Sequence, residues 1–235
     1  MKRSEINAIM RDADSFMRGH GFRLPPFAYW TPDDWASKGE EVREIVDRQL
    51  GWDITDFGSG DYERTGLFIF TIRNGDPARL ASGGGKLYAE KILISDVDQV
   101  TPFHFHWRKV EDIINRGGGK LVIQLYNSTS EDGLDDSDIT VSTDGVQRRV
   151  PAGSKIVLEP GESITLPTRL YHSFWAEEGR VLIGEVSLVN DDNTDNRFYR
   201  PVGRFPQIEE DEPPLHLLTT DYAVWYRPDG TDGGR

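Results

Sequence analysis

The stretch TPFHFHWRKVE, residues 101–111, contains three side chains that can bind a metal ion. His104 and His106 are two positions apart, and Glu111 follows five positions later. Side chains alternate between the two faces of a strand, so on a strand both imidazoles point the same way, about 6.5–7 Å apart at Cα. Two imidazoles at this spacing can bind one ion, with Glu111 adding a carboxylate oxygen. The alternative is a strand that carries two histidines and no metal.

A second stretch, GESITLPTRLYH (161–172), favours the metal site. It predicts a turn at Gly161, a short strand, Pro167, and then His172 on the next strand. An HxH pair followed by Glu, then by a glycine, a proline and a lone histidine, resembles the two sequence motifs of the cupin superfamily. The usual glycine after the proline is missing within residues 168–170, and no asparagine follows His172. The ligand positions themselves match.

The whole chain resembles a narrower group, the D-lyxose isomerase family. The similarity covers about residues 1–225, including YAEKILISDVDQVTPFHFHWRKVEDIINRGGGKLVIQLYNS, LPTRLYHSFWAEEG and IGEVSLVNDDNTDNRF. It implies a metal-dependent isomerase that interconverts D-lyxose and D-xylulose, with D-mannose and D-fructose as a second pair. It also implies that one divalent ion, with manganese favoured, is bound by His104, His106, Glu111 and His172.

The chemistry of this ligand set agrees with that implication. Three neutral imidazoles and one carboxylate suit Mn²⁺, Fe²⁺, Co²⁺ or Ni²⁺, with Zn²⁺ also allowed. An open-chain aldose can chelate such an ion through its C1 carbonyl and C2 hydroxyl oxygens. The reaction also needs a base that moves a proton between C2 and C1, and a group that moves protons between the two oxygens.

Three charged residues are candidates for these catalytic roles. Glu185 interrupts the apolar strand RVLIGEVSLV, which suits a general base, although a structural ion pair is the alternative. Lys91 shares a strand face with Ala89 and Leu93 and can point inward beside the metal, or outward from an edge strand. Lys109 lies between two ligands and either contacts substrate or is solvated.

Candidates for substrate binding are weaker. Asp191, Asp192 and Arg197 follow the Glu185 strand and can bind sugar hydroxyls, but a polar run of this kind is more often a surface loop. Trp107 and Phe174, together with Trp175, can form walls of the pocket, although aromatic residues more often pack in a core.

Composition narrows the class of protein. With 40 acidic and 27 basic residues among 235, the net charge is −13, so a nucleic-acid partner is not expected. The chain has no cysteine, which excludes thiol chemistry and suits a cytoplasmic protein. The N-terminus has no apolar run typical of a signal peptide, and no segment has about 20 apolar residues in a row, so we expect no membrane contact.

The element pattern predicts a mainly β fold, a cupin-type antiparallel β-barrel (jelly roll) with N-terminal α-helices. Helices are expected from Ser4 to about Gly19 and from Thr31-Pro32 to about Leu50. Strands are expected at 66–72, 86–95, 101–107, 120–127, 139–142, 154–160, 162–167, 171–176 and 180–189. We expect a helical arm over 1–51, the barrel over 52–203, and an acidic, proline-rich segment over 204–235 whose end, 228–235, is disordered.

Two other functions use the same fold. A cupin dioxygenase can hold Fe²⁺ with the same ligand set, and a non-catalytic cupin can bind a sugar without turning it over. The charges of Lys91 and Glu185 within apolar strands argue against the non-catalytic alternative. A homodimer is expected, because cupins often pair through an edge strand or an arm, and the N-terminal helices can serve as that arm.

Overall fold

The computed structural model describes residues 1–228 of the 235-residue chain. The predicted disorder of the last residues therefore falls almost entirely outside the described part. The helical elements are α1 (Arg3–Gly19), η1 (Pro26–Tyr29), α2 (Pro32–Ala36), η2 (Glu40–Val42), α3 (Arg43–Asp47), η3 (Pro77–Ser82) and α4 (Tyr222–Trp225). No helix among the described residues is long and apolar enough to cross a membrane.

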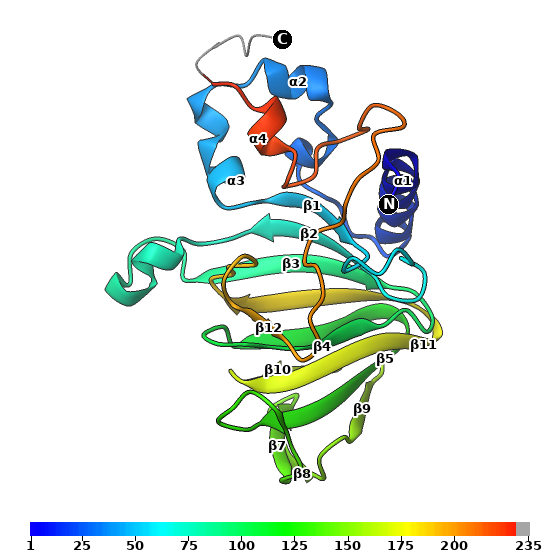
Figure 1. The fold of residues 1–235 in the computed structure, drawn as a ribbon, viewed down its shortest axis with the longest axis vertical. Coiled ribbons are helices and arrows are strands. Elements are labelled where there is room, and N and C mark those ends of the chain that lie inside the picture. Colours follow the sequence, from blue (N-terminus) through cyan, green and yellow to red (C-terminus); the bar gives the residue numbers. More distant parts are fainter. Residues whose placement is uncertain (229–235) are drawn as a thin grey trace.

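Twelve antiparallel strands form the rest of the described fold (Figure 1). They are β1 (Gly51–Thr55), β2 (Leu67–Arg73), β3 (Tyr88–Ser95), β4 (Thr101–His106), β5 (Glu111–Ser128), β6 (Leu134–Asp135), β7 (Ile139–Thr143), β8 (Val146–Val150), β9 (Lys155–Leu158), β10 (Ser163–Leu166), β11 (Leu170–Leu188) and β12 (Asn196–Phe198). The main path of pairing is β1-β2-β3-β11-β5-β10-β7-β8, while β4 pairs with β11 and β12. This is the antiparallel jelly-roll barrel that the sequence predicts.

Two long strands, β5 and β11, pair with each other along most of their length and join the two halves of the barrel. The first half of β11 pairs with β4 and its second half with β3. The prediction of separate strands at 171–176 and 180–189, and of a strand that starts only at 120, was therefore wrong. The glycine run at 117–119 bends β5 instead of ending it. A Cβ on Gly118 would lie 2.0 Å from the Arg180 carbonyl oxygen, so only glycine fits.

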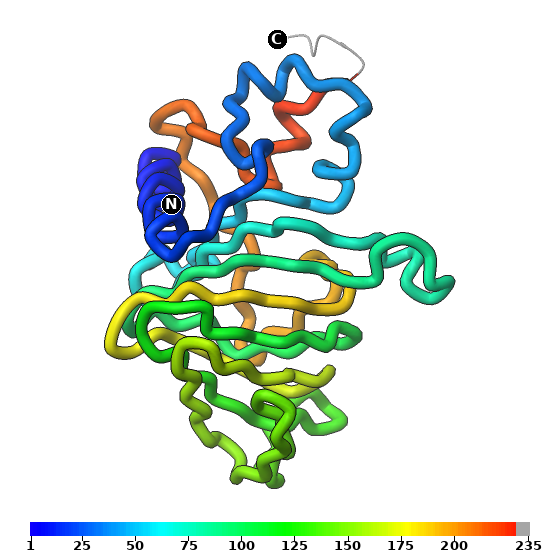
Figure 2. The backbone as a smooth tube through the Cα atoms, turned by 180° about the vertical axis from the view of Figure 1, so that it is seen from behind, coloured from blue at the N-terminus to red at the C-terminus, as the bar shows by residue number. Residues whose placement is uncertain are grey.

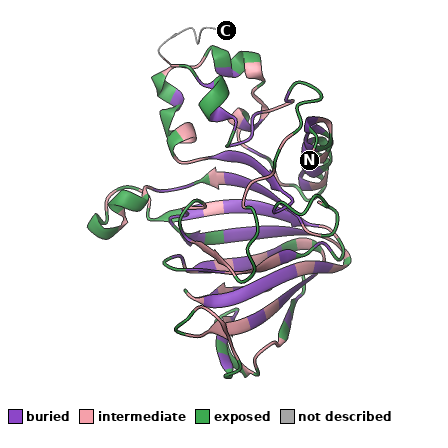
Figure 3. Cartoon of the chain, in the orientation of Figure 1, coloured by how far each residue is buried: buried purple, intermediate pink, exposed green. Residues whose placement is uncertain are grey.

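The described residues form three hydrophobic clusters, and the two largest lie on opposite sides of the sheet formed by β1, β2, β3 and β11. Figure 3 shows the buried residues along these strands and on α1. The inner cluster fills the barrel with alternate residues of β2, β5, β7 and β11. The outer cluster lies between the sheet and α1, where Ile6, Met10, Ala13 and Met17 are fully buried. Their spacing of three and four residues gives the apolar face that the sequence predicts for this helix.

Both predicted helices differ in detail from the observed ones. Helix α1 begins at Arg3, not after a Ser4 cap, and Ser4 hydrogen-bonds Asp211 instead. The predicted helix from Thr31 to about Leu50 is broken into α2, η2 and α3. Thr31 does cap α2, but the helix ends after Ala36, and the Glu41 side chain accepts the Gly39 N–H. Strands β1, β6, β8 and β12 were not predicted, because short strands with polar residues show little alternation.

The C-terminal segment returns to α1 (Figures 1 and 2). Arg3, which is 1% exposed, pairs with Asp221 at 2.9 Å and with Glu210 at 2.6 Å. Asn7 and Ser4 bind the same segment through Glu212 and Asp211. The acidic residues of this segment are therefore bound to α1, and the chain between β12 and this anchor runs back over the strands toward α1 (Figure 1). The proposed division at residues 51 and 203 remains a prediction.

We expect Arg3→Met to lower the free energy of unfolding by about 3 kcal/mol, because it leaves the Asp221 carboxylate buried without its counter-charge. Urea denaturation followed by circular dichroism measures this difference.

Arg43→Met is the matched control, because Arg43 pairs with Glu40 and Asp47 at the surface, where ion pairs contribute little to stability. An Arg3 variant no less stable than this control would contradict the anchoring role of Arg3.

Candidate active site

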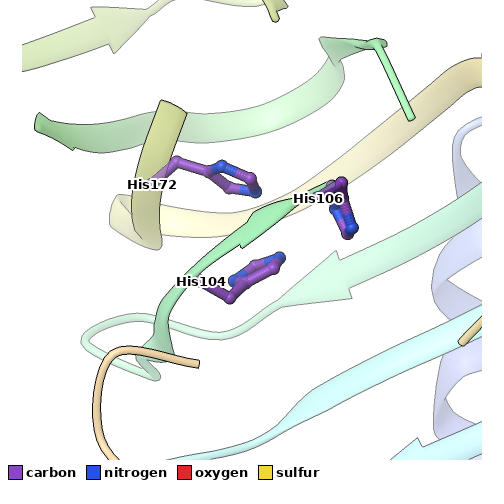
Figure 4. A group of neighbouring side chains, drawn as sticks. All are labelled: His104, His106 and His172. Carbon is purple, nitrogen blue, oxygen red and sulfur yellow. The ribbon is translucent and has the colours of Figure 1, made fainter. Parts of the chain in front are cut away.

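Three histidines meet inside the barrel (Figure 4). His104 and His106 lie on β4, and His172 lies directly opposite His104 on β11. One ligand nitrogen from each ring lies within 4.8 Å of the other two. The structure therefore brings together the two histidine motifs that the sequence places more than sixty residues apart.

Each of these imidazoles is oriented by a backbone carbonyl. The Nδ1 atoms lie 2.8 Å from the Pro102 oxygen for His104, 3.0 Å from the Asp195 oxygen for His106, and 2.9 Å from the Leu170 oxygen for His172. A carbonyl oxygen only accepts hydrogen bonds, so each Nδ1 carries the hydrogen. In a neutral imidazole the lone pair is then on Nε2, the atom that can bind a metal.

Glu111, the first residue of β5, completes the group. Its Oε1 lies 3.1 Å from His172 Nε2 and 3.4 Å from His106 Nε2. His172 Nε2 makes no hydrogen bond within residues 1–228, although it is buried. A carboxylate oxygen and an imidazole lone pair at this distance repel each other unless a positive charge lies between them. The arrangement is therefore compatible with a divalent metal ion, and these donors fit one.

The protonation states also suit metal binding. Burial, followed by the neighbouring imidazoles, holds the pKa of His104 well below its usual value, and burial also lowers the pKa of His106. Burial alone would raise the pKa of Glu111, but the Lys109 ammonium, together with His106 and His172, outweighs burial and holds this pKa well below its usual value. Neutral imidazoles and an ionised carboxylate are the forms that bind metals.

A chain of buried charges of alternating sign runs from Glu111 across the cavity. Lys109 Nζ lies 2.7 Å from Glu111 Oε2 and 2.8 Å from Glu185 Oε1. Lys91, directly opposite Glu185 in the sheet, lies 3.6 Å from both Glu185 and Asp192. Each charge is thus compensated by a neighbour, which is what a buried ionic group requires.

Arg204, in the segment that follows β12, ends this chain of charges. It lies 3.3 Å from Asp192 and pairs with Asp53 of β1. Burial alone would raise the pKa of Asp192, but Arg204 and then the two lysines outweigh it and hold this pKa well below its usual value. The cavity wall of charged residues is therefore drawn from four separate parts of the chain.

The cavity combines this charged wall with an apolar one. Its lining residues are Phe57, Leu67, Ile69, Lys91, Leu93, Thr101, His104, His106, Lys109, Glu111, Ile113, His172, Phe174, Glu185, Asp192, Asn196, Phe198 and Arg204. The predicted ligands, Glu185, Lys91, Lys109 and Phe174 are all among them. Lys91 is 3% exposed on an interior strand, so the alternative of a solvent-facing lysine was wrong.

Three residues predicted to bind substrate do not line the cavity. Trp107 is 38% exposed and packs against Phe105 on the outside of the barrel. Asp191 accepts hydrogen bonds from the backbone of its own loop. Arg197 alternates on β12 with the two cavity residues Asn196 and Phe198, so it points to the opposite side.

Sequence reasoning missed Arg204, Thr101 and the role of Asp195. The Asp195 carboxylate accepts the backbone N–H groups of Arg108 and Lys109, and its carbonyl orients His106. No motif marks Arg204 or Asp195. They reach the site through β12 and the C-terminal segment, whose pairing with β4 the sequence does not indicate.

The chain matches known proteins along nearly all of its length. The D-lyxose isomerase family model matches residues 1–222. The chain is 50% identical over 225 residues to the D-lyxose/D-mannose isomerase of Serratia proteamaculans, covering 94% of this chain and 98% of that protein. It is 49% identical over the same length to the enzyme of that name from Escherichia coli O157:H7, with the same coverage.

Solved structures confirm the fold. L-Ribose isomerase of Cellulomonas parahominis with L-psicose superposes with a TM-score of 0.59 at 17% identity, and that of Acinetobacter sp. DL28 in complex with L-ribose with 0.60 at 16%. Each match covers 89% of this chain and 98% of the other. With a family match over residues 1–222 and half-identical relatives along nearly all of its length, the chain belongs to the D-lyxose isomerase family and is an aldose–ketose isomerase.

Proposed function

We propose that this protein interconverts D-lyxose with D-xylulose, and D-mannose with D-fructose, by proton transfer on an open-chain sugar. The observation that carries the proposal is the presence, in one cavity, of a convergent ligand set and the buried carboxylate of Glu185. The names of the two half-identical relatives, both D-lyxose/D-mannose isomerases, support both sugars. Lyxose and mannose share the configuration at C2, so a site that binds C1 to C3 accepts either.

The proposed cofactor is one divalent ion, Mn²⁺, bound by His104, His106, Glu111 and His172. When bound, such an ion would act as a Lewis acid on the C1 carbonyl and C2 hydroxyl oxygens of the sugar. The protein supplies neutral imidazoles already oriented by three carbonyl groups, so little reorganisation accompanies binding.

Glu185 is the proposed general base. Its carboxylate takes the proton from C2 of the aldose, which leaves an enediol, and returns that proton to C1 to give the ketose. Lys109 holds Glu185 in position, because its three N–H groups face three acceptors, on Glu111, Glu185 and Asn190. We therefore assign Lys109 a positioning role in the catalytic group.

Lys91 is the proposed group that moves protons between the two oxygens. Among residues 1–228 its ammonium makes one hydrogen bond, 2.8 Å to Asn190 Oδ1, and its two carboxylate neighbours are 3.6 Å away, beyond hydrogen-bond distance. It therefore has N–H groups available for the sugar. In this role it donates a proton to O1 and recovers one from O2.

The assembly and location are part of the proposal. A homodimer is supported by Tyr88, Val186 and Leu188, apolar residues on β3 and β11 that are each more than a third exposed. A cytoplasmic location is supported by the lack of cysteine. Helix α1, the proposed arm, packs on the sheet of its own chain.

Purified protein is expected to contain one divalent ion per chain by elemental mass spectrometry. His172→Gln removes one of the four proposed ligands. Removing a residue that only hydrogen-bonds a ligand lowers metal affinity by roughly 10–100-fold, so we expect a larger loss of metal affinity here.

His20→Gln is the control, because His20 is exposed on the end of α1 and is expected to leave metal content unchanged. Equal metal content in the two variants would contradict the proposed ligand set.

Glu185→Gln is expected to lower kcat for D-lyxose by about 10³-fold, because the amide cannot accept the C2 proton. Metal content should stay at the wild-type level, since Glu185 is not a proposed ligand.

Glu178→Gln, on the exposed turn of the same long strand, should keep wild-type kcat. Undiminished turnover in Glu185→Gln would remove Glu185 from the mechanism.

D-Lyxose deuterated at C2 should lose part of its label to water during conversion, because the proton passes through a side chain that exchanges with solvent. Mass spectrometry of the D-xylulose formed measures the label. Complete retention would instead indicate a hydride shift from C2 to C1.

A further inference from the structure

The cavity contains a second polar feature, the hydroxyl of Thr101, which the proposed mechanism does not use. Thr101 is 1% exposed, and its Oγ1 makes no hydrogen bond with any residue in the described range 1–228. Burying a hydroxyl without a partner costs free energy, and native proteins keep few such groups. Valine would fill the same space without this cost, so the presence of a threonine needs a reason that involves its hydroxyl.

A bulge in β4 turns Thr101 toward the histidines. His104 lies opposite His172, and Thr101 lies opposite Phe174. The chain therefore advances three residues on β4 but only two on β11 between these two pairs, so β4 has one extra residue. Without the extra residue, Thr101 and His104 would point to opposite faces. The extra step includes Pro102, whose carbonyl accepts the Nδ1 hydrogen of His104. One distortion therefore orients a proposed ligand and brings the free hydroxyl into the same cavity.

Thr101 lies toward the apolar part of the cavity. Its cross-strand neighbour is Phe174, and it lies three steps along the strand from His104, which is about 10 Å at most between the two Cα atoms. A sugar bound through C1 and C2 near the histidines extends its remaining carbons over such a distance. Apolar side chains cannot bind the hydroxyls on those carbons, whereas a threonine hydroxyl both donates and accepts.

We propose that Thr101 is a substrate-contacting residue whose hydroxyl binds the C4 or C5 hydroxyl of the sugar. This inference rests on the proposed function and adds to it the group that recognises the end of the substrate away from the carbonyl. It explains why a hydroxyl stands where no other residue of the described chain offers it a partner.

The test compares Thr101→Val with Thr101→Ser. Valine has the same shape without the hydroxyl, so kcat/KM for D-lyxose should fall about tenfold while the melting temperature stays equal or rises. Serine keeps the hydroxyl and loses a buried methyl group, so the melting temperature should fall while kcat/KM stays near wild type. The valine variant is therefore expected to be the more stable and the less active of the two. A purely structural role would make the less stable variant the less active one.

Thr143→Val is the matched control. Thr143 is also a buried threonine, 2% exposed, with a hydroxyl that makes no hydrogen bond within the described residues, but it does not line the cavity. Its valine variant should keep wild-type kcat/KM and equal or higher stability.

Deoxy sugars identify the partner hydroxyl. With wild-type enzyme, either 4-deoxy- or 5-deoxy-D-lyxose should show the same roughly tenfold loss in kcat/KM as Thr101→Val shows with D-lyxose. Thr101→Val should lose nothing further with that analogue. A variant that loses activity equally on D-lyxose and both analogues would overturn the proposal.

Failure of the inference and failure of the proposed function give different results. If wild-type protein with Mn²⁺ does not convert D-lyxose or D-mannose, the proposed function fails. If it does convert them, but Thr101→Val has the same kcat/KM as Thr143→Val, only the role of Thr101 is overturned.

Discussion

The antiparallel pairing of β4 with β11 is the constraint on which the site depends. It sets His104 opposite His172 and, through the bulge at Pro102, turns the carbonyl that orients His104. A shift of one residue in this register would move the β4 histidines to the outer face. The bulge fixes the register locally, because an extra residue fits only where the partner strand allows it.

The site also requires that each buried charge in the cavity be compensated by a neighbouring charge of opposite sign. Glu111, Glu185 and Asp192 are carboxylates in a cavity where burial opposes charge, and each is stabilised by a lysine or arginine next to it. Removing one member leaves its neighbours uncompensated, so these residues act as a unit. Arg204 belongs to this unit, and its segment is anchored beyond the cavity by Arg3 of α1. The N-terminal helix thus supports a cavity that it does not contact.

Prediction from the sequence worked where spacing alone fixes geometry. The HxH pair on a strand, the apolar face of α1 and the charged positions Lys91 and Glu185 within apolar strands all follow from periods of two or 3.6 residues. Prediction failed where the same local sequence pattern is compatible with two structures. Glycine runs usually mark turns, but Gly118 lies where β5 and β11 approach too closely for any side chain. Trp107 and Arg197 have suitable chemistry, but strand alternation turns them outward.

The sequence by itself determined the fold class, the histidines and Glu111 as a candidate ligand set, and Glu185 with the two lysines as candidate catalytic groups, because residue type and local period carry that information. Tertiary structure alone decided that these groups meet in one cavity, that Asp192 and Arg204 complete its charge balance, and that Thr101 faces the same space. Those facts depend on pairings between segments as far apart as β1 and the chain after β12. Such long-range contacts arise from the packing of the whole core and leave no periodic signal in the chain.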